Sequence, residues 1–418
     1  MKNKSIKHSH NFSPVWKKVF LGWTIILSGI IASCGEDDPI EKPVVEVPTQ
    51  TLLMYLPWST NLLPFFNINI ADMEEAIAEG ILEHERVLVF LATSPTNASM
   101  FELTYDAANG TCERQPLKEY EDHRCTTAEG ITSILNDMKT FAPATTYSMT
   151  IGGHGMGWLP VLNNTPPLIA IKASTTHTTA PVYHWDAKSD YQTRHFGGTT
   201  TNYQTDITTL AKAIEDANIT MEYILFDACY MSCIEVAYDL RHVTRHLIAS
   251  TCEIMGYGMP FHPMAQHLLG DINYEGITQS FYDFYIGYSM PCGTIATTVT
   301  EELDSLATLM QKINTLNTWD QKQTSSLQYF DGYNPHIFYD LGDYVNNLCT
   351  DTLLLAQFNE QLERAVPPAL CKHTPTFYSA YNNRQKNIQV FSGLTISAPS
   401  THQLAFPKTE TNWYKATH

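Results

Sequence analysis

The sequence predicts an α/β fold in which helices cover both faces of a mainly parallel sheet. Short continuous apolar runs, such as residues 87–92 and 221–226, are typical of strands buried on both sides. Segments with apolar residues at helical spacing alternate with these runs along the chain. This alternation of strand and helix patterns indicates a parallel sheet that is covered by helices.

The expected elements follow one another in chain order. Strands are expected at residues 51–58, 87–92, 146–151, 221–226, 245–250 and 391–397. Helices are expected at residues 71–85, 128–141, 205–217, 233–240, 301–316 and 342–349. Residues 161–204 are rich in Thr, Asn, Pro and Gly, so we expect a long loop or insertion there. No internal repeat or second linker is found, which favours one domain at residues 51–400, with C-terminal additions and a tail at residues 401–418.

Composition and charge narrow the class of protein. The 418 residues are 44% hydrophobic and 16% charged, which is ordinary for a globular protein and argues against a disordered or fibrous chain. The formal charge is −18, and such a surface would repel nucleic acid or an anionic membrane surface. We therefore expect no nucleic-acid partner.

The first 33 residues have the pattern of an export signal. Five lysines and no acidic residue occur in this segment, and an apolar run at residues 19–31 ends before small residues. The run is shorter than the roughly 20 apolar residues that a spanning helix needs. Ile31-Ala32-Ser33-Cys34 resembles a bacterial lipobox, in which the cysteine is lipidated and becomes the new N-terminus. A plain signal peptide and an uncleaved anchor are the alternatives.

We expect residues 1–33 to be a lipoprotein signal peptide and residues 34–50 to be a solvated tether, rich in Pro and Val towards its end. The protein is then exported and anchored to the cell envelope, at the outer membrane, through a lipid on Cys34. Removing residues 1–33 leaves 20 basic and 43 acidic side chains, so the formal charge becomes −23.

The nine cysteines do not form a metal-binding or disulfide pattern. No CxxC pair occurs, and no cysteine and histidine cluster has zinc-finger spacing, so we expect no metal site. Cys112 and Cys125 flank a polar segment, and the sequence leaves open whether they form a disulfide.

Two apolar strands end in reactive residues. Residues 151–158, Ile-Gly-Gly-His-Gly-Met-Gly-Trp, contain His154, and residues 224–231, Ile-Leu-Phe-Asp-Ala-Cys-Tyr-Met, contain Cys229. Sites in open α/β sheets form outside the carboxyl ends of the strands, so neighbouring strands would bring an imidazole and a thiol to one edge. A histidine within hydrogen-bond reach activates a thiol. Each segment alone also fits an ordinary core cysteine or a loop histidine.

The glycines beside His154 predict a close approach of the backbone to a substrate, because a residue without Cβ leaves room for it. The backbone N–H groups of Gly155 and Cys229 could then donate to the oxyanion that forms during acyl transfer.

These segments resemble a known family. Residues 152–158, Gly-Gly-His-Gly-Met-Gly-Trp, are similar to the catalytic-histidine segment of the clostripain family of cysteine peptidases. Residues 226–240, Phe-Asp-Ala-Cys-Tyr-Met-Ser-Cys-Ile-Glu-Val-Ala-Tyr-Asp-Leu, closely resemble its catalytic-cysteine segment. Weaker likenesses occur at residues 249–258, 340–343 and 392–395, so the resemblance extends from about residue 51 to residue 400.

The resemblance implies a caspase-like fold, a Cys229/His154 dyad and endopeptidase activity after Arg or Lys. It also implies self-cleavage between the two catalytic segments, where Lys172, Lys188 and Arg194 are candidate sites. Asp227 matches an acidic residue that helps to line the family's P1 pocket, and a carboxylate there pairs well with a basic side chain. Substrates are then proteins or peptides. No cofactor is implied, and calcium dependence stays open.

The sequence departs from the family pattern at two places. Met259-Pro260 stands where a Trp is expected after the glycine, and Gly153 stands where Ser or Asp is frequent. Both departures concern the shape of the pocket more than the dyad.

Two other functions stay open at this stage. A catalytically inactive surface lipoprotein could bind glycan or protein, for which the 11% aromatic content would be suitable. A processing protease dedicated to one partner is the third reading.

Overall fold

The computed structural model describes residues 47–121, 124–161 and 196–418, all within one compact unit that spans residues 47–418. The expected signal peptide, most of the tether and Cys34 lie outside these residues. Lys172, Lys188 and Arg194, the candidate self-cleavage sites, also lie outside them. In the part of the chain that the structure describes, no helix is both long and apolar enough to cross a membrane.

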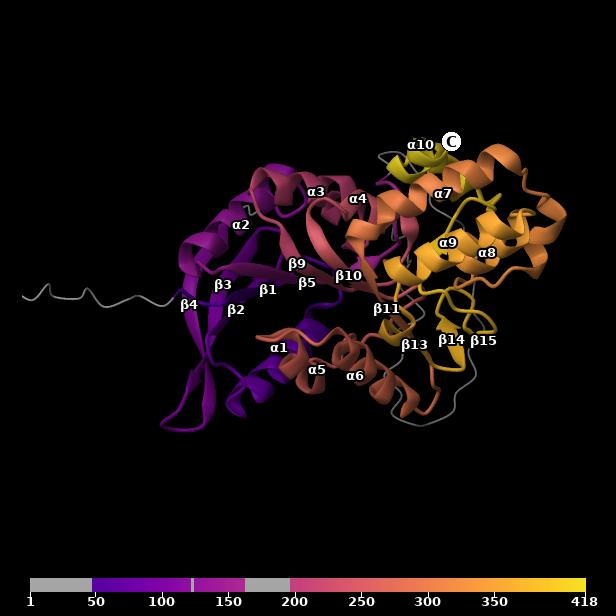
Figure 1. Cartoon of the computed structure of the whole chain (residues 1–418). Coiled ribbons are helices and arrows are strands. Elements are labelled where there is room, and N and C mark those ends of the chain that lie inside the picture. The colour runs from indigo at the N-terminus through magenta and orange to yellow at the C-terminus, as the bar shows by residue number, and fades with distance from the viewer. Residues whose placement is uncertain (1–46, 122–123, 162–195) are drawn as a thin grey trace, which may run out of the picture. The chain divides into compact units, whose positions relative to one another are not determined.

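A nine-stranded sheet forms the centre of the described unit (Figure 1), in the order β13-β11-β10-β9-β5-β1-β2-β3-β4. Its five inner strands, from β10 to β2, are parallel, and the pairs outside them are antiparallel. This mainly parallel sheet confirms the predicted fold class. The bounds are β1 Gln50–Leu56, β2 Glu85–Ala92, β3 Asn97–Asp106, β4 Thr111–Glu121, β5 Thr146–Gly152, β9 Met221–Asp227, β10 Thr244–Ala249, β11 Thr294–Val299 and β13 Cys371–His373.

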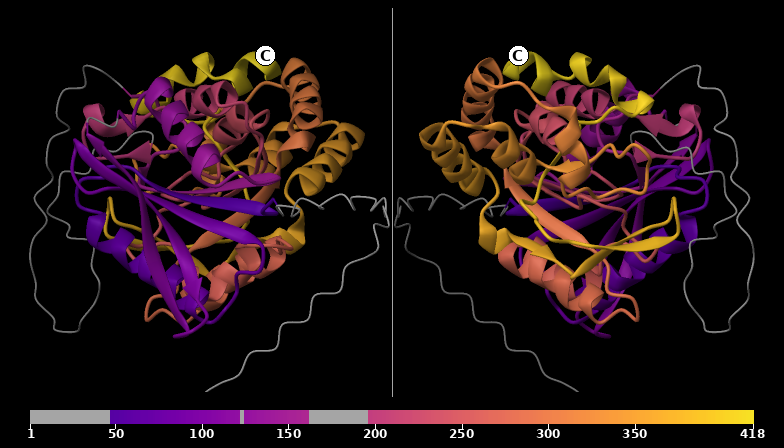
Figure 2. Two further views of the ribbon diagram at one scale, coloured as in Figure 1. Left: turned by 90° about the vertical axis from the view of Figure 1, so that its left-hand side faces the viewer. Right: turned by 90° about the vertical axis from the view of Figure 1, so that its right-hand side faces the viewer.

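Helices cover both faces of this sheet (Figures 1 and 2). One face carries α1 (Leu63–Ala78), α5 (Phe261–Leu268) and α6 (Tyr274–Ile286); the other carries α2 (Ala128–Phe141), α3 (Ile207–Asp216), α4 (Ile234–Leu240) and α7 (Leu303–Leu316). Alternate residues of β1 enter the two cores, with Leu53 and Tyr55 on the α2 side and Leu52 and Met54 on the α1 side.

The C-terminal additions pack beside the α4 and α7 face. They include α8 (Leu341–Leu348), α9 (Thr352–Ala365) and α10 (Asn412–Thr417). Trp413 of α10 is buried and meets Tyr238 of α4 edge to face, with ring centroids 5.4 Å apart. Short strands complete the fold: β6 (His154–Gly155), β7 (Phe196–Gly197), β8 (Gln204–Thr205), β12 (Tyr339–Asp340), β14 (Thr376–Ser379), β15 (Arg384–Asn387) and β16 (Thr395–Ile396).

Several elements differ from the sequence expectation. The first helix begins at Leu63 and ends at Ala78, earlier at both ends than residues 71–85, because a proline suits its first turn and Gly80 (φ +85°) follows its end. The late strand at 391–397 shortens to β16. The β3–β4 hairpin was not expected, because β4 is mostly exposed and polar. The disulfide between Cys112 and Cys125 that the sequence left open is not formed.

Candidate active site

The carboxyl ends of β5 and β9 bring the two reactive segments together. These neighbouring parallel strands pair up to Gly152 and Asp227, and the N–H of Gly153 then donates to the carbonyl of Asp227 (3.2 Å). Gly155 lies directly against Cys229: a Cβ at Gly155 would stand only 2.3 Å from the carbonyl oxygen and 2.7 Å from the nitrogen of Cys229. Only glycine permits this approach, which places His154 and Cys229 in adjoining backbone segments.

The imidazole of His154 is buried and contacts an asparagine. His154 is 2% exposed, and its backbone pairs with Gly197 in the small β6–β7–β8 sheet. Its Nε2 atom lies 2.8 Å from Oδ1 of Asn61, and since an amide oxygen can only accept, Nε2 carries the proton. The basic lone pair of the ring is then on Nδ1. Burial lowers the pKa of His154 to about 4, so the imidazole is neutral at pH 7.

The turn that carries Asn61 is held in a strained conformation. It connects β1 to α1, and Thr60 adopts the left-handed region with φ 60°. The hydroxyl of Thr60 accepts the N–H of Thr199 (3.1 Å), and the N–H of Leu62 donates to the carbonyl of Ser59 (3.3 Å). The first bond holds the turn against the segment that also pairs with His154, and the second closes the turn itself.

Cys229 follows β9 directly and rests as a protonated thiol. The N–H of Ile254 donates to its sulfur (3.3 Å). Burial raises the pKa of Cys229 above its ordinary value of 9.0, and the nearby carboxylate of Glu253 raises that pKa further. The backbone N–H of Cys229 donates to no acceptor among the described residues. The resting pair is therefore a neutral thiol and a neutral imidazole.

Tyr230 fixes the bend that presents the cysteine. Its φ is 62°, its N–H donates to the carbonyl of Cys252 (3.1 Å), and its ring stacks on Phe338 with centroids 4.8 Å apart. Its hydroxyl donates to Glu253, which also accepts the hydroxyl of Ser379 (3.0 Å). Contacts on the ring, the backbone and the hydroxyl thus leave the chain beside Cys229 little freedom.

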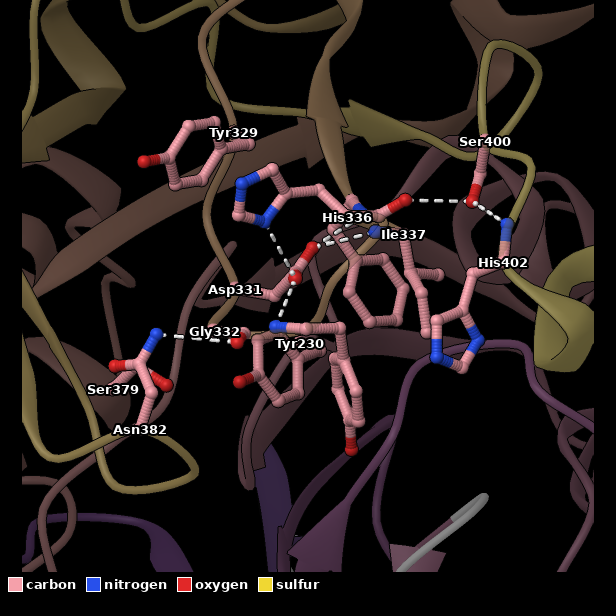
Figure 3. A network of polar contacts seen from close by, with 12 residues as sticks. Tyr230, Tyr329, Asp331, Gly332, His336, Ile337, Ser379, Asn382, Ser400 and His402 are labelled. Atoms are coloured by element: carbon pink, nitrogen blue, oxygen red, sulfur yellow. Dashed lines mark hydrogen bonds and ion pairs between the residues drawn. The ribbon is translucent and has the colours of Figure 1, made fainter. Parts of the chain in front are cut away.

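A buried aspartate, Asp331, holds the loop that carries Phe338 through hydrogen bonds (Figure 3). Asp331 is fully buried and accepts the backbone N–H groups of Tyr333 (2.8 Å), Ile337 (2.8 Å) and Phe338 (2.7 Å), and it also contacts the ring of His336 (3.2 Å). The hydroxyl of Tyr333 reaches the sulfur of Met156, two residues after His154. One loop therefore braces both reactive segments.

A narrow pocket opens beside the thiol. Its cavity volume is about 30 Å³, and it lies between the start of α1, the end of β9 and the loop before α5. The lining residues are Leu62, Phe65, Phe66, Asn69, Gly153, Asp227, Ala228, Cys229, Ile254, Met255, Gly256 and Gly258. Asp227 and Cys229 thus share one pocket.

The carboxylate of Asp227 is covered by backbone on one side. Oδ1 accepts the N–H of Met259 (3.1 Å), and a Cβ at Gly258 would stand 2.3 Å from Oδ2. Burial raises the pKa of Asp227 from 3.8 to about 7, so the carboxylate gains from a cationic partner. The described residues contain no group of three or more His, Cys, Asp or Glu side chains that could hold a metal ion.

Sequence reasoning missed Asn61 and Asn69. Neither belongs to a motif, and each reaches the site only through the packing of the β1–α1 region. His154, Gly155, Asp227 and Cys229, which the sequence singled out, are brought to one edge of the sheet.

A thiol and an imidazole at adjoining strand ends of a mainly parallel sheet define the class of caspase-like cysteine peptidases. The sequence model of the clostripain family matches residues 183–361. A secreted C11 cysteine protease from Bacteroides thetaiotaomicron, iotapain, is 50% identical over 89% of this chain and 100% of its own, with a TM-score of 0.79. The chain belongs to the clostripain (C11) family and is a cysteine-type peptidase.

Further solved structures are similar. A clostripain from B. thetaiotaomicron ATCC 29148, in complex with the peptide inhibitor BTN-VLTK-AOMK, is 57% identical over 54% of this chain and 99% of its own, with a TM-score of 0.52. An inactive zymogen C11 protease from Parabacteroides distasonis is 25% identical over 90% of this chain and 100% of its own, with a TM-score of 0.72. No curated protein matches the chain.

Proposed function

We propose that this peptidase is an endopeptidase that uses Cys229 as nucleophile and His154 as general base, and that it cleaves after Lys or Arg. The observation that carries the proposal is the meeting of the β5 and β9 ends, which puts Gly155 against the backbone of Cys229 and Asp227 in the same pocket as the thiol.

The neutral resting pair fits a mechanism in which the proton moves during attack. Nδ1 of His154 takes the thiol proton as the sulfur of Cys229 attacks the peptide carbonyl. The tetrahedral intermediate collapses to a thioester, and the imidazolium returns the proton to the leaving amine. Water then attacks the thioester, with His154 again as the base, and the acid product leaves.

Two backbone groups and one side chain assist these steps. The N–H groups of Gly155 and Cys229 stabilise the oxyanion, and the N–H of Cys229 has no acceptor among the described residues. Asn61 acts as a positioning residue, because its contact with Nε2 fixes the tautomer in which Nδ1 can accept the thiol proton.

Asp227 provides the preference for a basic P1 side chain. A partly buried carboxylate with no cation among the described residues of its pocket is costly, and a bound ammonium or guanidinium would relieve that cost. The peptide of the inhibitor bound by the 57% identical relative is written VLTK and ends in lysine, which supports a basic P1. Met259-Pro260 adjoins this carboxylate, because the backbone N–H of Met259 donates to Oδ1 of Asp227.

The cellular setting is also part of the proposal. A secreted relative supports export, and we place a signal peptide at residues 1–33, a lipid anchor on Cys34 with a tether to residue 50, and the peptidase domain at residues 51–400 with a tail at 401–418. The peptide inhibitor of the relative supports peptide or protein substrates.

Self-cleavage at Lys172, Lys188 or Arg194 would follow from a basic P1 preference. Incubating wild type beside Cys229→Ala and sequencing new N-termini tests it: fragments should appear in the wild type alone. Equal fragments from both proteins, or an active wild type that stays intact, would reject self-processing.

A panel of fluorogenic peptides ending in Lys, Arg, Asp or Leu tests the endopeptidase proposal. The wild type should cleave the Lys and Arg peptides best, and Cys229→Ala and His154→Ala should lose activity by at least about 10²-fold while remaining folded. Wild-type turnover in Cys229→Ala would show that the nucleophile is assigned wrongly.

A further inference from the structure

Asn69 is a buried amide in the wall of the P1 pocket. It lies on α1, is 1% exposed and lines the cavity together with Asp227. Its Nδ2 atom donates to the carbonyl of Tyr257 (3.0 Å) and lies 3.4 Å from the carbonyl of Met259. Since only the NH₂ end of an amide can donate to carbonyls, these two bonds fix which end of the side chain faces the 257–259 loop.

The other end of this amide is an acceptor that the protein does not use. Oδ1 of Asn69 forms no hydrogen bond among the described residues. Five side-chain polar atoms of the described residues are fully buried and have no partner. Oδ1 of Asn69 is not one of these five, so it keeps slight contact with solvent. A ligand that supplies a donor here would satisfy a group that otherwise depends on water.

The carboxylate beside it offers a limited surface. Oδ1 of Asp227 is already engaged by the N–H of Met259, and Gly258 covers the carboxylate closely enough that no Cβ would fit. The pocket thus presents two separate acceptors, one carboxylate and one amide oxygen, rather than an open carboxylate edge. A planar guanidinium binds best to an open edge in a bidentate manner, whereas an ammonium directs three donors to separate acceptors.

The walls of the pocket favour the slimmer group. The rings of Phe65 and Phe66 border it, and a Cβ at Gly256 would stand 2.9 Å from the Phe65 ring. A pocket walled by these rings suits a linear stem with a compact head better than a broad guanidinium.

We propose that Asn69 is a second P1-recognising residue and that the Asn69–Asp227 pair selects lysine over arginine. This inference rests on the proposed P1 pocket. In the bound state the P1 ammonium donates to a carboxylate oxygen of Asp227 and to Oδ1 of Asn69, and no proton is transferred.

The test compares three matched fluorogenic peptides that differ only in P1: lysine, arginine and norleucine. Wild-type kcat/KM should be highest for lysine. Asn69→Ala should lower kcat/KM for lysine about tenfold or more, because one hydrogen bond to a charged group is lost, and should lower it less for arginine and norleucine. Asn67→Ala, an exposed asparagine on the same helix, is the matched control and should leave all three values unchanged.

A second variant guards against a loss of fold. Asn69→Ser keeps a donor for one of the loop carbonyls, but its shorter side chain no longer presents the amide oxygen to the pocket, so it should lose the lysine preference even if Asn69→Ala does not fold. The ratio of kcat/KM for lysine to that for norleucine, measured on one sample, does not depend on the fraction of folded enzyme and should fall in both variants. An equal loss for all three peptides in Asn69→Ala, a wild type that prefers arginine, or an unchanged lysine preference in Asn69→Ser would overturn the inference. Asp227→Asn tests the proposed function separately. It should lower kcat/KM for both the lysine and the arginine peptide, whatever the outcome for the Asn69 variants.

Discussion

Replacing Asp227 by Asn removes one charge from the P1 pocket and keeps the side-chain shape. Asp227 is partly buried, its pocket adjoins Cys229, and none of the described residues that line the cavity is a cation. Losing one partner of a buried charge pair costs roughly 2–5 kcal/mol, or about 30- to 5,000-fold in kcat/KM. The loss should fall on peptides with P1 lysine or arginine and spare a norleucine peptide.

The pH dependence of the P1 preference is a second test of Asp227. Burial raises the pKa of Asp227 to about 7, so the free enzyme binds a proton there as the pH falls below neutral. The ratio of kcat/KM for lysine to that for norleucine should therefore fall about tenfold for each pH unit below 7 in the wild type. In Asp227→Asn this ratio should be small and independent of pH.

The same charge should lower stability. A carboxyl whose pKa is higher in the folded than in the unfolded state stabilises the fold only while it is protonated. For Asp227 this contribution is complete below the unfolded pKa of 3.8 and is lost as the pH rises through about 7. At pH 8 the loss is on the order of 4 kcal/mol. Asp227→Asn should therefore unfold at a higher temperature than the wild type at pH 8, and the gap should close towards pH 4.

Peptide kinetics from pH 5 to 9 and thermal melts from pH 4 to 9 measure all three effects. Asp72→Asn is the control, because Asp72 bonds the hydroxyl of Tyr257 (2.7 Å) near the pocket without lining it. It should leave the lysine to norleucine ratio unchanged. An equal loss for lysine and norleucine in Asp227→Asn, or a pH-independent ratio in the wild type, would refute the reasoning.

Three further predictions follow from the site and the N-terminus. Asn61→Ala should lower kcat by about 2- to 13-fold, the worth of one neutral hydrogen bond, while Asn67→Ala should not; an unchanged kcat would remove Asn61 from the mechanism. Alkylation of Cys229 by iodoacetamide, followed by mass spectrometry, should accelerate with pH above 8, since burial keeps the thiol protonated; a rate plateau between pH 5 and 8 would instead indicate a preformed ion pair. Cys34→Ala should abolish membrane partitioning in the native cell, and an unmodified Cys34 on the mature protein would contradict lipidation.

The sequence predicted the inner sheet well, because strands buried on both faces consist of continuous apolar residues. The expected strand at 87–92 lies within β2, and the expected helix at 128–141 coincides with α2. The outer strand β4 was missed for the same reason: its residues are mostly exposed, so it lacks the apolar pattern of the inner strands.

The candidate site was predicted in part. His154 and Cys229 follow apolar strands directly, so the rule that sites lie at the carboxyl ends of parallel strands was enough to bring them together. Asn61 and Asn69 could not be found this way. The position of Asn61 depends on a turn that is fixed by Thr60 and Thr199. The orientation of the Asn69 amide depends on carbonyls of a loop far along the chain. Such roles arise from tertiary packing and leave no local pattern in the sequence.

The most direct test of the central claim is to titrate the enzyme with a lysine-ending peptide ketone inhibitor and to map the modified residue by mass spectrometry. The adduct should form on Cys229 alone, and activity should fall in proportion to its occupancy, reaching zero at one label per chain. His154→Ala should label far more slowly. Full activity with Cys229 modified, or inactivation through an adduct on another cysteine, would contradict the assignment of the active site.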